Sequence, residues 1–133
     1  MTAALQLGRI VWVTIPDPQG RNPKSRPAAI HSITGDGMVS VVAITSRIGM
    51  AHPDATVPIP WQRNGHPRTK LTRPSEAVCT WMVRLPLSEI RPTAGRVPVA
   101  EMMLINEILD RLHPPAAPPA QAVNPPLPNG SPP

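Results

Sequence analysis

MVSVVAITS, residues 38–46, is the most strongly β-branched stretch of the chain, and it predicts a β-strand. The preceding residues, TGDG (34–37), predict a hairpin turn. RPAAIHSI (26–33) predicts the partner strand, with Pro27 at its start. RIVWVTI (9–15) predicts another strand. Both of its faces are largely apolar, which is expected of a strand buried in a closed barrel.

The chain beyond residue 46 predicts shorter strands and then one helix. Residues 55–59 and 76–83 are expected to be strands, and residues 87–90 a short turn or strand end. Residues 99–112 carry apolar side chains at helical spacing, namely Met102, Ile105, Leu109 and Leu112. Consecutive short strands followed by a single helix predict a mainly β fold, a small barrel, rather than alternating βαβ units.

The length of 133 residues fits one domain, which we expect to span residues 1–113. Residues 114–133, PPAAPPAQAVNPPLPNGSPP, contain no charged residue and are dominated by Pro and Ala. Such a segment cannot bury enough apolar surface to fold and favours extended polyproline II. We therefore expect a disordered tail, and a passive role is favoured over a PxxP-type ligand.

The composition of the chain argues against several classes of protein. One cysteine, Cys79, cannot form an internal disulfide. Neither a signal peptide nor a membrane span is evident, so a cytoplasmic protein is expected. The chain has no Phe and no Tyr, which argues against RNA-binding modules that stack bases on a Tyr/Phe sheet face. Trp12 and Trp81 are expected in the core. Trp61 either stacks on a base or packs at the end of the barrel as part of its core, and the second position is preferred.

The charge is basic and unevenly distributed. The formal net charge is +5, and the isoelectric point is about 11.1. Residues 18–35 and 55–75 contain no Asp or Glu, yet they hold seven cations: Arg21, Lys24, Arg26, Arg63, Arg68, Lys70 and Arg73. If the two stretches open on one face, they form a groove that follows phosphates. The alternative is two solvated loops without a ligand. The absence of acidic residues favours binding, with His66 as a further candidate contact.

Several kinds of site are not indicated by the sequence. The four histidines (His31, His52, His66 and His113) are scattered without the spacing of metal ligands. GxxxxGK[ST], GxGxxG and GxSxG are absent. No pair of carboxylates is poised as acid and base. We therefore expect no metal and no cofactor, and an enzyme would have to work through Arg, Thr, Ser or His.

Three segments in order resemble the MazF/PemK family of toxins from toxin–antitoxin pairs. They are GRIVWV (8–13), SRPAAI (25–30) and VVAITS (41–46), and the resemblance covers roughly residues 8–112. It implies an SH3-like barrel of the CcdB/PemK type, usually a homodimer. It also implies a ribosome-independent endoribonuclease that cuts single-stranded RNA at short sequence motifs.

The same resemblance implies that Arg26 and Thr45 are the catalytic pair. RNA supplies its own nucleophile, the 2′-hydroxyl, so a metal-bound water is not required. Arg26 would mainly stabilise charge on the phosphate, with proton donation to the leaving 5′-oxygen as a second option. Thr45 would hydrogen-bond the phosphate or the 2′-hydroxyl, and Ser46 would assist. The implied products carry a 2′,3′-cyclic phosphate and a 5′-hydroxyl.

The chain departs from the family pattern in residues 17–25, which are poorer in glycine and more basic than in many relatives. This leaves the cut-site preference open. A cognate antitoxin with an acidic, initially disordered segment is the expected partner. Two alternatives remain. One is a non-catalytic barrel that binds nucleic acid or gyrase, and the other is an adaptor that recruits partners through its proline tail.

Overall fold

The computed structural model describes residues 7–49 and 51–113. Six strands precede one helix: β1 (Arg9–Ile15), β2 (Lys24–Ile33), β3 (Met38–Thr45), β4 (Thr56–Ile59), β5 (Ser75–Pro86), β6 (Arg91–Arg96) and α1 (Val99–Leu112). Two single-turn 3-10 helices, η2 (Pro53–Ala55) and η3 (Leu87–Glu89), lie before β4 and before β6. The tail expected at residues 114–133 lies outside the described residues. None of the helices described is long and apolar enough to cross a membrane.

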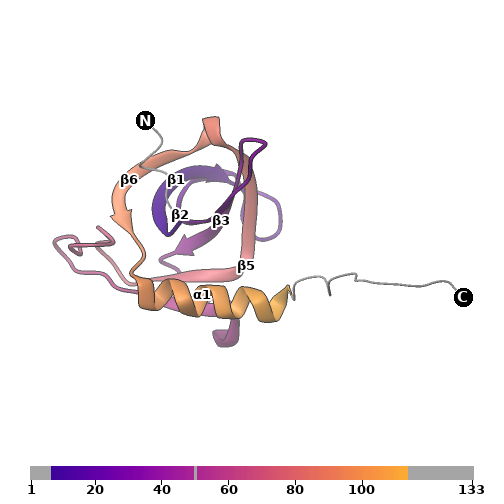
Figure 1. Cartoon of the computed structure of the whole chain (residues 1–133). Helices are drawn as coiled ribbons and strands as arrows, with labels where there is room; N and C mark the ends of the chain where they lie inside the picture. The colour runs from indigo at the N-terminus through magenta and orange to yellow at the C-terminus, as the bar shows by residue number, and fades with distance from the viewer. Residues whose placement is uncertain (1–6, 50, 114–133) are drawn as a thin grey trace, which may run out of the picture.

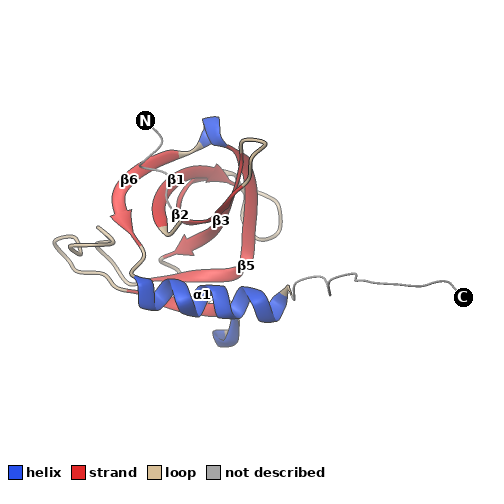
Figure 2. Cartoon of the chain, viewed as in Figure 1, coloured by secondary structure: helices blue, strands red, loops and turns tan. Residues whose placement is uncertain are grey.

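All six strands form one antiparallel sheet in the order β4-β5-β3-β2-β1-β6. The sheet curls around on itself, and α1 runs along its outside (Figure 1). Strands therefore dominate the molecule, with the helix at the C-terminal end of the described chain (Figure 2). The predicted fold class, mainly β with a C-terminal helix, is confirmed.

The curled sheet buries apolar side chains on both of its faces. One core fills the inside of the curl, with Val11, Val13 and Ile30 among its members. The second lies between the outer face and α1, where Val42 and Ile44 pack with Ile105. Because neighbouring residues of a strand point to opposite faces, a strand between two cores must be apolar on both sides. This explains the continuous apolar runs in the sequence.

The helix packs one apolar face against the sheet. Ile105, Ile108 and Leu109 are buried, and Met102 packs against the same core. Leu112, which shares the predicted helical spacing, is 39% exposed at the C-terminal end of the helix.

Strand boundaries differ from the predictions mainly where residues are polar. β2 begins at Lys24, before the predicted Arg26, and places Pro27 inside the strand opposite Trp12. β6 was not predicted as a strand at all. It pairs with β1 at the sheet's edge, and Gly95 is its only buried residue. Such an edge strand has no apolar pattern by which to recognise it.

Two tryptophan predictions are wrong and one is confirmed. Trp81 is buried, with 5% of its surface exposed, and it belongs to the inner core. Trp12 is 44% exposed and Trp61 is 42% exposed. Trp12 points to the outer side of β1, between the buried Val11 and Val13. A cavity rather than packed side chains lies beside it there.

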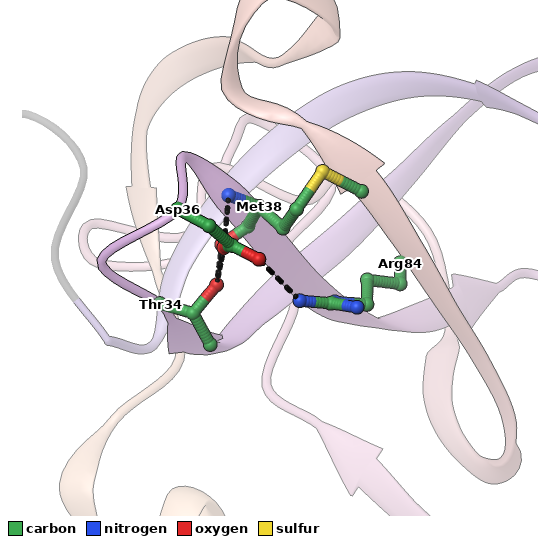
Figure 3. Close-up of polar contacts among 4 residues, drawn as sticks. All are labelled: Thr34, Asp36, Met38 and Arg84. Atoms are coloured by element: carbon green, nitrogen blue, oxygen red, sulfur yellow. Dashed lines mark hydrogen bonds and ion pairs between the residues drawn. The ribbon is translucent and has the colours of Figure 1, made fainter.

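The predicted hairpin turn between β2 and β3 is tied by polar contacts of Asp36 (Figure 3). Thr34 Oγ1 and the Met38 backbone N–H both donate to the Asp36 carboxylate, and Arg84 of β5 pairs with it at 3.0 Å. The Thr34 hydrogen bond is the largest cause that lowers the pKa of Asp36 below its usual value. The turn lies at the start of β3, so it fixes the register of the hairpin from the end opposite Thr45.

Candidate active site

The start of β2 and the end of β3 meet at one end of the sheet. Ala28 pairs with Ala43 in the β2–β3 ladder, and continuing this register by two residues places Arg26 opposite Thr45. Both side chains are half-buried. Both also line the same cavities. The two residues that the family resemblance selected are therefore neighbours across a hairpin.

Two adjoining cavities open at this end of the sheet and share Lys24, Arg26, Thr45 and Ser46. The first, here called the outer cavity, has a volume of about 460 Å³. Besides the shared residues it is lined by Trp12, Ser25, Pro27, Ile44, Lys70, Leu71, Thr72, Arg73 and Ser75. No carboxylate lines it. Four cations and no carboxylate in the lining make this a site for an anion.

The second, the end cavity, has a volume of about 350 Å³ and reaches over Trp81. Its remaining lining residues are Asp17, Pro18, Gln19, Asn22 and Arg47. Most of these carry groups that donate or accept hydrogen bonds. The end cavity is therefore suited to a polar ligand, whereas the outer cavity combines cations with apolar side chains.

The guanidinium of Arg26 is held in place from three sides. Its Nε donates to the Ile15 carbonyl oxygen at 3.3 Å, and one terminal nitrogen donates to the Asn22 carbonyl oxygen at 3.4 Å. Its Cζ lies 5.0 Å from the centroid of the Trp81 ring, within the range of a cation–π contact. The indole N–H of Trp81 is itself fixed by the Pro16 carbonyl oxygen at 3.2 Å. Among the described residues, none accepts a hydrogen bond from the other terminal nitrogen of Arg26, Nη1.

Asp17 organises the loop between β1 and β2. Its carboxylate accepts the backbone N–H groups of Gln19 at 3.0 Å and Arg21 at 2.8 Å, and the side-chain amide of Asn22 at 3.0 Å. The Arg21 hydrogen bond is the largest cause that lowers the pKa of Asp17, and the charge of Arg26 acts in the same direction. Because its oxygens already accept these donors, Asp17 supports the loop and is a weak base.

The segment after β3 is anchored around Thr45. The backbone N–H of Arg47 donates to Thr45 Oγ1 at 3.0 Å, which leaves the hydroxyl proton available as a donor. The Gly49 N–H donates to the carboxylate of Glu76 at 3.1 Å. Glu76 is buried and lies opposite Thr45 in the β3–β5 ladder. The turn that carries Ser46 and Arg47 is thus fixed at both of its ends.

The segment between β4 and β5, residues 60–74, is here called the basic loop. His66 Nδ1 accepts the backbone N–H groups of Arg68 at 3.1 Å and Thr69 at 3.3 Å. Thr69 is buried and donates its hydroxyl to the Pro60 carbonyl oxygen at 2.7 Å. These contacts fold the loop back on itself, which brings Lys70 and Arg73 to the outer cavity.

The basic loop is also attached to the edge strand β6. The Arg96 N–H donates to the Arg68 carbonyl oxygen at 2.9 Å. A Cβ added to Gly95 would lie 2.2 Å from the Thr69 carbonyl oxygen, so only glycine permits this approach. Lys70 adopts a φ of 64°, in the left-handed region. The backbone conformation of the loop and its contact with β6 together determine where its charges lie.

Six of the ten predicted site residues line these cavities: Lys24, Arg26, Thr45, Ser46, Lys70 and Arg73. Arg21, Arg63, His66 and Arg68 line neither. His66 is half-buried rather than exposed, and its ring holds the loop together. Other lining residues were missed, among them Trp12 and Arg47. Trp12 had been assigned to the core, and Arg47 lies outside the two acid-free stretches that marked the other cations.

In residues 7–49 and 51–113, no group of three or more His, Cys, Asp or Glu side chains could hold a metal ion.

Comparison with known proteins identifies a family and a fold. The family model described as "PemK-like, MazF-like toxin of type II toxin-antitoxin system" matches residues 6–113. None of the curated protein sequences matches the chain.

Solved structures with the same fold have low sequence identity to the chain. MazF from Deinococcus radiodurans is 19% identical, with a TM-score of 0.60, covering 80% of this chain and 94% of its own. The Mycobacterium tuberculosis toxin MazF-mt6 is 18% identical, with a TM-score of 0.55, covering 77% and 94%. An endoribonuclease solved with its cognate antitoxin, from a mycobacterial species, is 19% identical, with a TM-score of 0.58, covering 84% and 97%.

Proposed function

The chain belongs to the PemK-like, MazF-like toxins of type II toxin–antitoxin systems, and from that premise we propose that it is an endoribonuclease that cuts single-stranded RNA. The observation that carries the proposal is that Arg26 and Thr45 line the same cationic cavity. Neighbours of the same fold that are described as endoribonucleases support it. We place its action in the cytoplasm, with messenger RNA as the substrate.

In this proposal the scissile phosphate binds where the two cavities join. The 2′-oxygen forms a bond to phosphorus while the bond from phosphorus to the 5′-oxygen breaks. The 2′-hydroxyl proton leaves to water, and the 5′-oxygen takes up a proton from water. The products are a 2′,3′-cyclic phosphate and a 5′-hydroxyl. Because the nucleophile belongs to the substrate, the reaction needs no metal.

Arg26 stabilises the charge that develops on the phosphoryl oxygens. Its guanidinium is already positioned by Ile15, Asn22 and Trp81, so little reorganisation accompanies the reaction. Thr45 donates its hydroxyl proton to the phosphate or orients the 2′-hydroxyl. Ser46 offers a second hydroxyl beside it, and Lys24, Lys70 and Arg73 bind flanking phosphates.

We also propose a homodimer and a cognate antitoxin, following the family. Related toxins have been solved as complexes with antitoxins. An acidic, disordered antitoxin segment would complement the cations of the outer cavity and exclude RNA from it. Release of RNA from the toxin by an acidic peptide of that antitoxin would support this arrangement.

The test of the nuclease proposal is Arg26→Ala, assayed on unstructured RNA in EDTA. We expect the wild type to cut. The variant should lose about 10²- to 10³-fold in rate, since that is the usual cost of one charge-stabilising donor. Arg21→Ala is the matched control, because it removes the same charge from the loop just before β2, where Arg21 lines neither cavity. Intact RNA at high wild-type concentration would refute the proposal and favour a non-catalytic binding module.

A further inference from the structure

Trp12 is a large aromatic side chain exposed next to the proposed cleavage site. Its neighbours along β1, Val11 and Val13, are buried, whereas 44% of Trp12 is exposed. Across the sheet it lies between Pro27 of β2 and Arg91 of β6. The indole therefore forms part of the outer surface of the sheet and lines the outer cavity.

The outer cavity offers an apolar surface within a ring of positive charge. Pro27, Ile44 and Leu71 line it together with Trp12, and its cations are Lys24, Arg26, Lys70 and Arg73. A bare phosphate would use only the cations. A nucleotide uses both parts, because its base has two apolar faces while its phosphate carries the charge. The lining therefore fits a whole nucleotide of a single strand.

We propose that Trp12 stacks on the base of a nucleotide adjacent to the scissile phosphate, seated in the outer cavity. This inference rests on the proposed function, and it adds a binding residue to the site. Adjacency follows from the shared lining, since Arg26, Thr45 and Ser46 belong to both cavities. The nucleotide on the other side of the cut then occupies the end cavity.

The two cavities divide the recognition of RNA between them. Stacking accepts every base, because every base has an aromatic face, so the outer cavity contributes affinity. The end cavity presents hydrogen-bonding side chains, among them Gln19 and Asn22, which can read the edge of a base. Sequence preference at the cut therefore comes mainly from the end cavity.

The experiment measures binding of a short RNA whose 2′-hydroxyl groups are replaced by hydrogen, so that it cannot be cut. It carries the sequence that the wild type cuts or, if none is cut, a mixed sequence. Trp12→Leu keeps apolar volume but removes the aromatic face, and it should raise Kd about 5- to 150-fold, the equivalent of about 1–3 kcal/mol per stacked base. Trp12→Phe should restore most of the affinity.

Trp61→Leu is the matched control. Trp61 is 42% exposed but lines neither cavity, so its variant should bind as the wild type does. A second measurement removes single bases from the oligonucleotide next to the cut. At the stacked position, the penalty of Trp12→Leu should disappear. In a Trp61→Phe background, the intact oligonucleotide should quench tryptophan emission more than the abasic one. Adding Trp12→Leu should remove this difference, because the remaining Trp81 lies beside the end cavity.

Three results would overturn the inference. The first is a Trp12→Leu variant that binds as the wild type does. The second is a penalty that persists with every abasic oligonucleotide. The third is a change of oligomeric mass in Trp12→Leu without RNA, which would assign Trp12 to a protein contact instead. Binding that depends on Trp12 without any cleavage by the wild type would refute the nuclease and leave only the base-stacking role of Trp12 standing. Cleavage by the wild type that is unchanged in Trp12→Leu would refute this inference and leave the nuclease proposal standing.

Discussion

Lys70 carries its charge on a backbone conformation that most side chains avoid. Its φ of 64° lies in the left-handed region, where a non-glycine residue costs about 1–3 kcal/mol. The surrounding loop maintains this conformation through the hydrogen bond from Lys70 N–H to the His66 carbonyl oxygen at 2.9 Å. The strained position brings the ammonium group to the outer cavity.

This conformation allows the charge of Lys70 to be tested without disturbing the loop. Lys70→Gly should keep the backbone, because glycine adopts positive φ freely, and the thermal stability should stay equal or rise. RNA affinity should fall a few-fold. The slope of log K against log salt should become shallower by about 0.7, the value for one phosphate contact on a single strand. Binding titrations at several salt concentrations measure both, and an unchanged slope would remove Lys70 from the site.

Among the structural elements, the contact between β6 and the basic loop depends on Gly95. A methyl group at this position would meet the Thr69 carbonyl oxygen, which is backbone and cannot rotate away. We therefore expect Gly95→Ala to displace the loop and lower the unfolding free energy by about 1–3 kcal/mol. RNA binding should weaken because Lys70 and Arg73 move.

Gly35→Ala is the control for this substitution, because a Cβ there meets nothing within 4 Å. Chemical denaturation measures the unfolding free energy of both variants, and RNA titration measures their affinity. A Gly95→Ala protein with wild-type stability and affinity would show that the loop is positioned by other contacts.

The sequence predicts elements well where the pattern is local. β1 and α1 begin and end at the predicted residues, because alternation and helical periodicity are properties of neighbouring positions. The approach of Arg26 to Thr45 also follows from a short hairpin whose turn residues are recognisable. β6 could not be predicted, since its pairing with β1 leaves no apolar pattern in its own sequence.

Parts of the candidate site depend on long-range contacts and escaped prediction. The exposure of Trp12 could not be predicted from the sequence, because both faces of β1 are apolar. Alternation does not distinguish a side chain in the core from one that lines a cavity. Charge counting selected Arg63, His66 and Arg68 together with Lys70 and Arg73. Only the folded loop, with its approach to Gly95, separates those that line the cavity from those that do not.

At the scale of the whole molecule, the reactivity of Cys79 reports whether the core between the sheet and α1 opens. This thiol is fully buried in the outer core, and burial raises its pKa to about 11. The reactive thiolate is therefore scarce at neutral pH. We expect iodoacetamide to leave the native protein unmodified at pH 8 and to react at a rate set by unfolding or by detachment of α1. Rapid labelling without denaturant would show that this layer opens readily.

The order of strands has a consequence for how such a protein changes over generations. β2 and β3 lie in the middle of the sheet, each with a bonded neighbour on both sides, and they carry Arg26 and Thr45. The lining that would read sequence comes instead mainly from connecting segments, namely residues 16–23 and residues 46–47 after β3. Insertions and substitutions in those segments leave the ladders intact. Descendants of one ancestor can therefore acquire different targets while the cutting step itself is inherited unchanged.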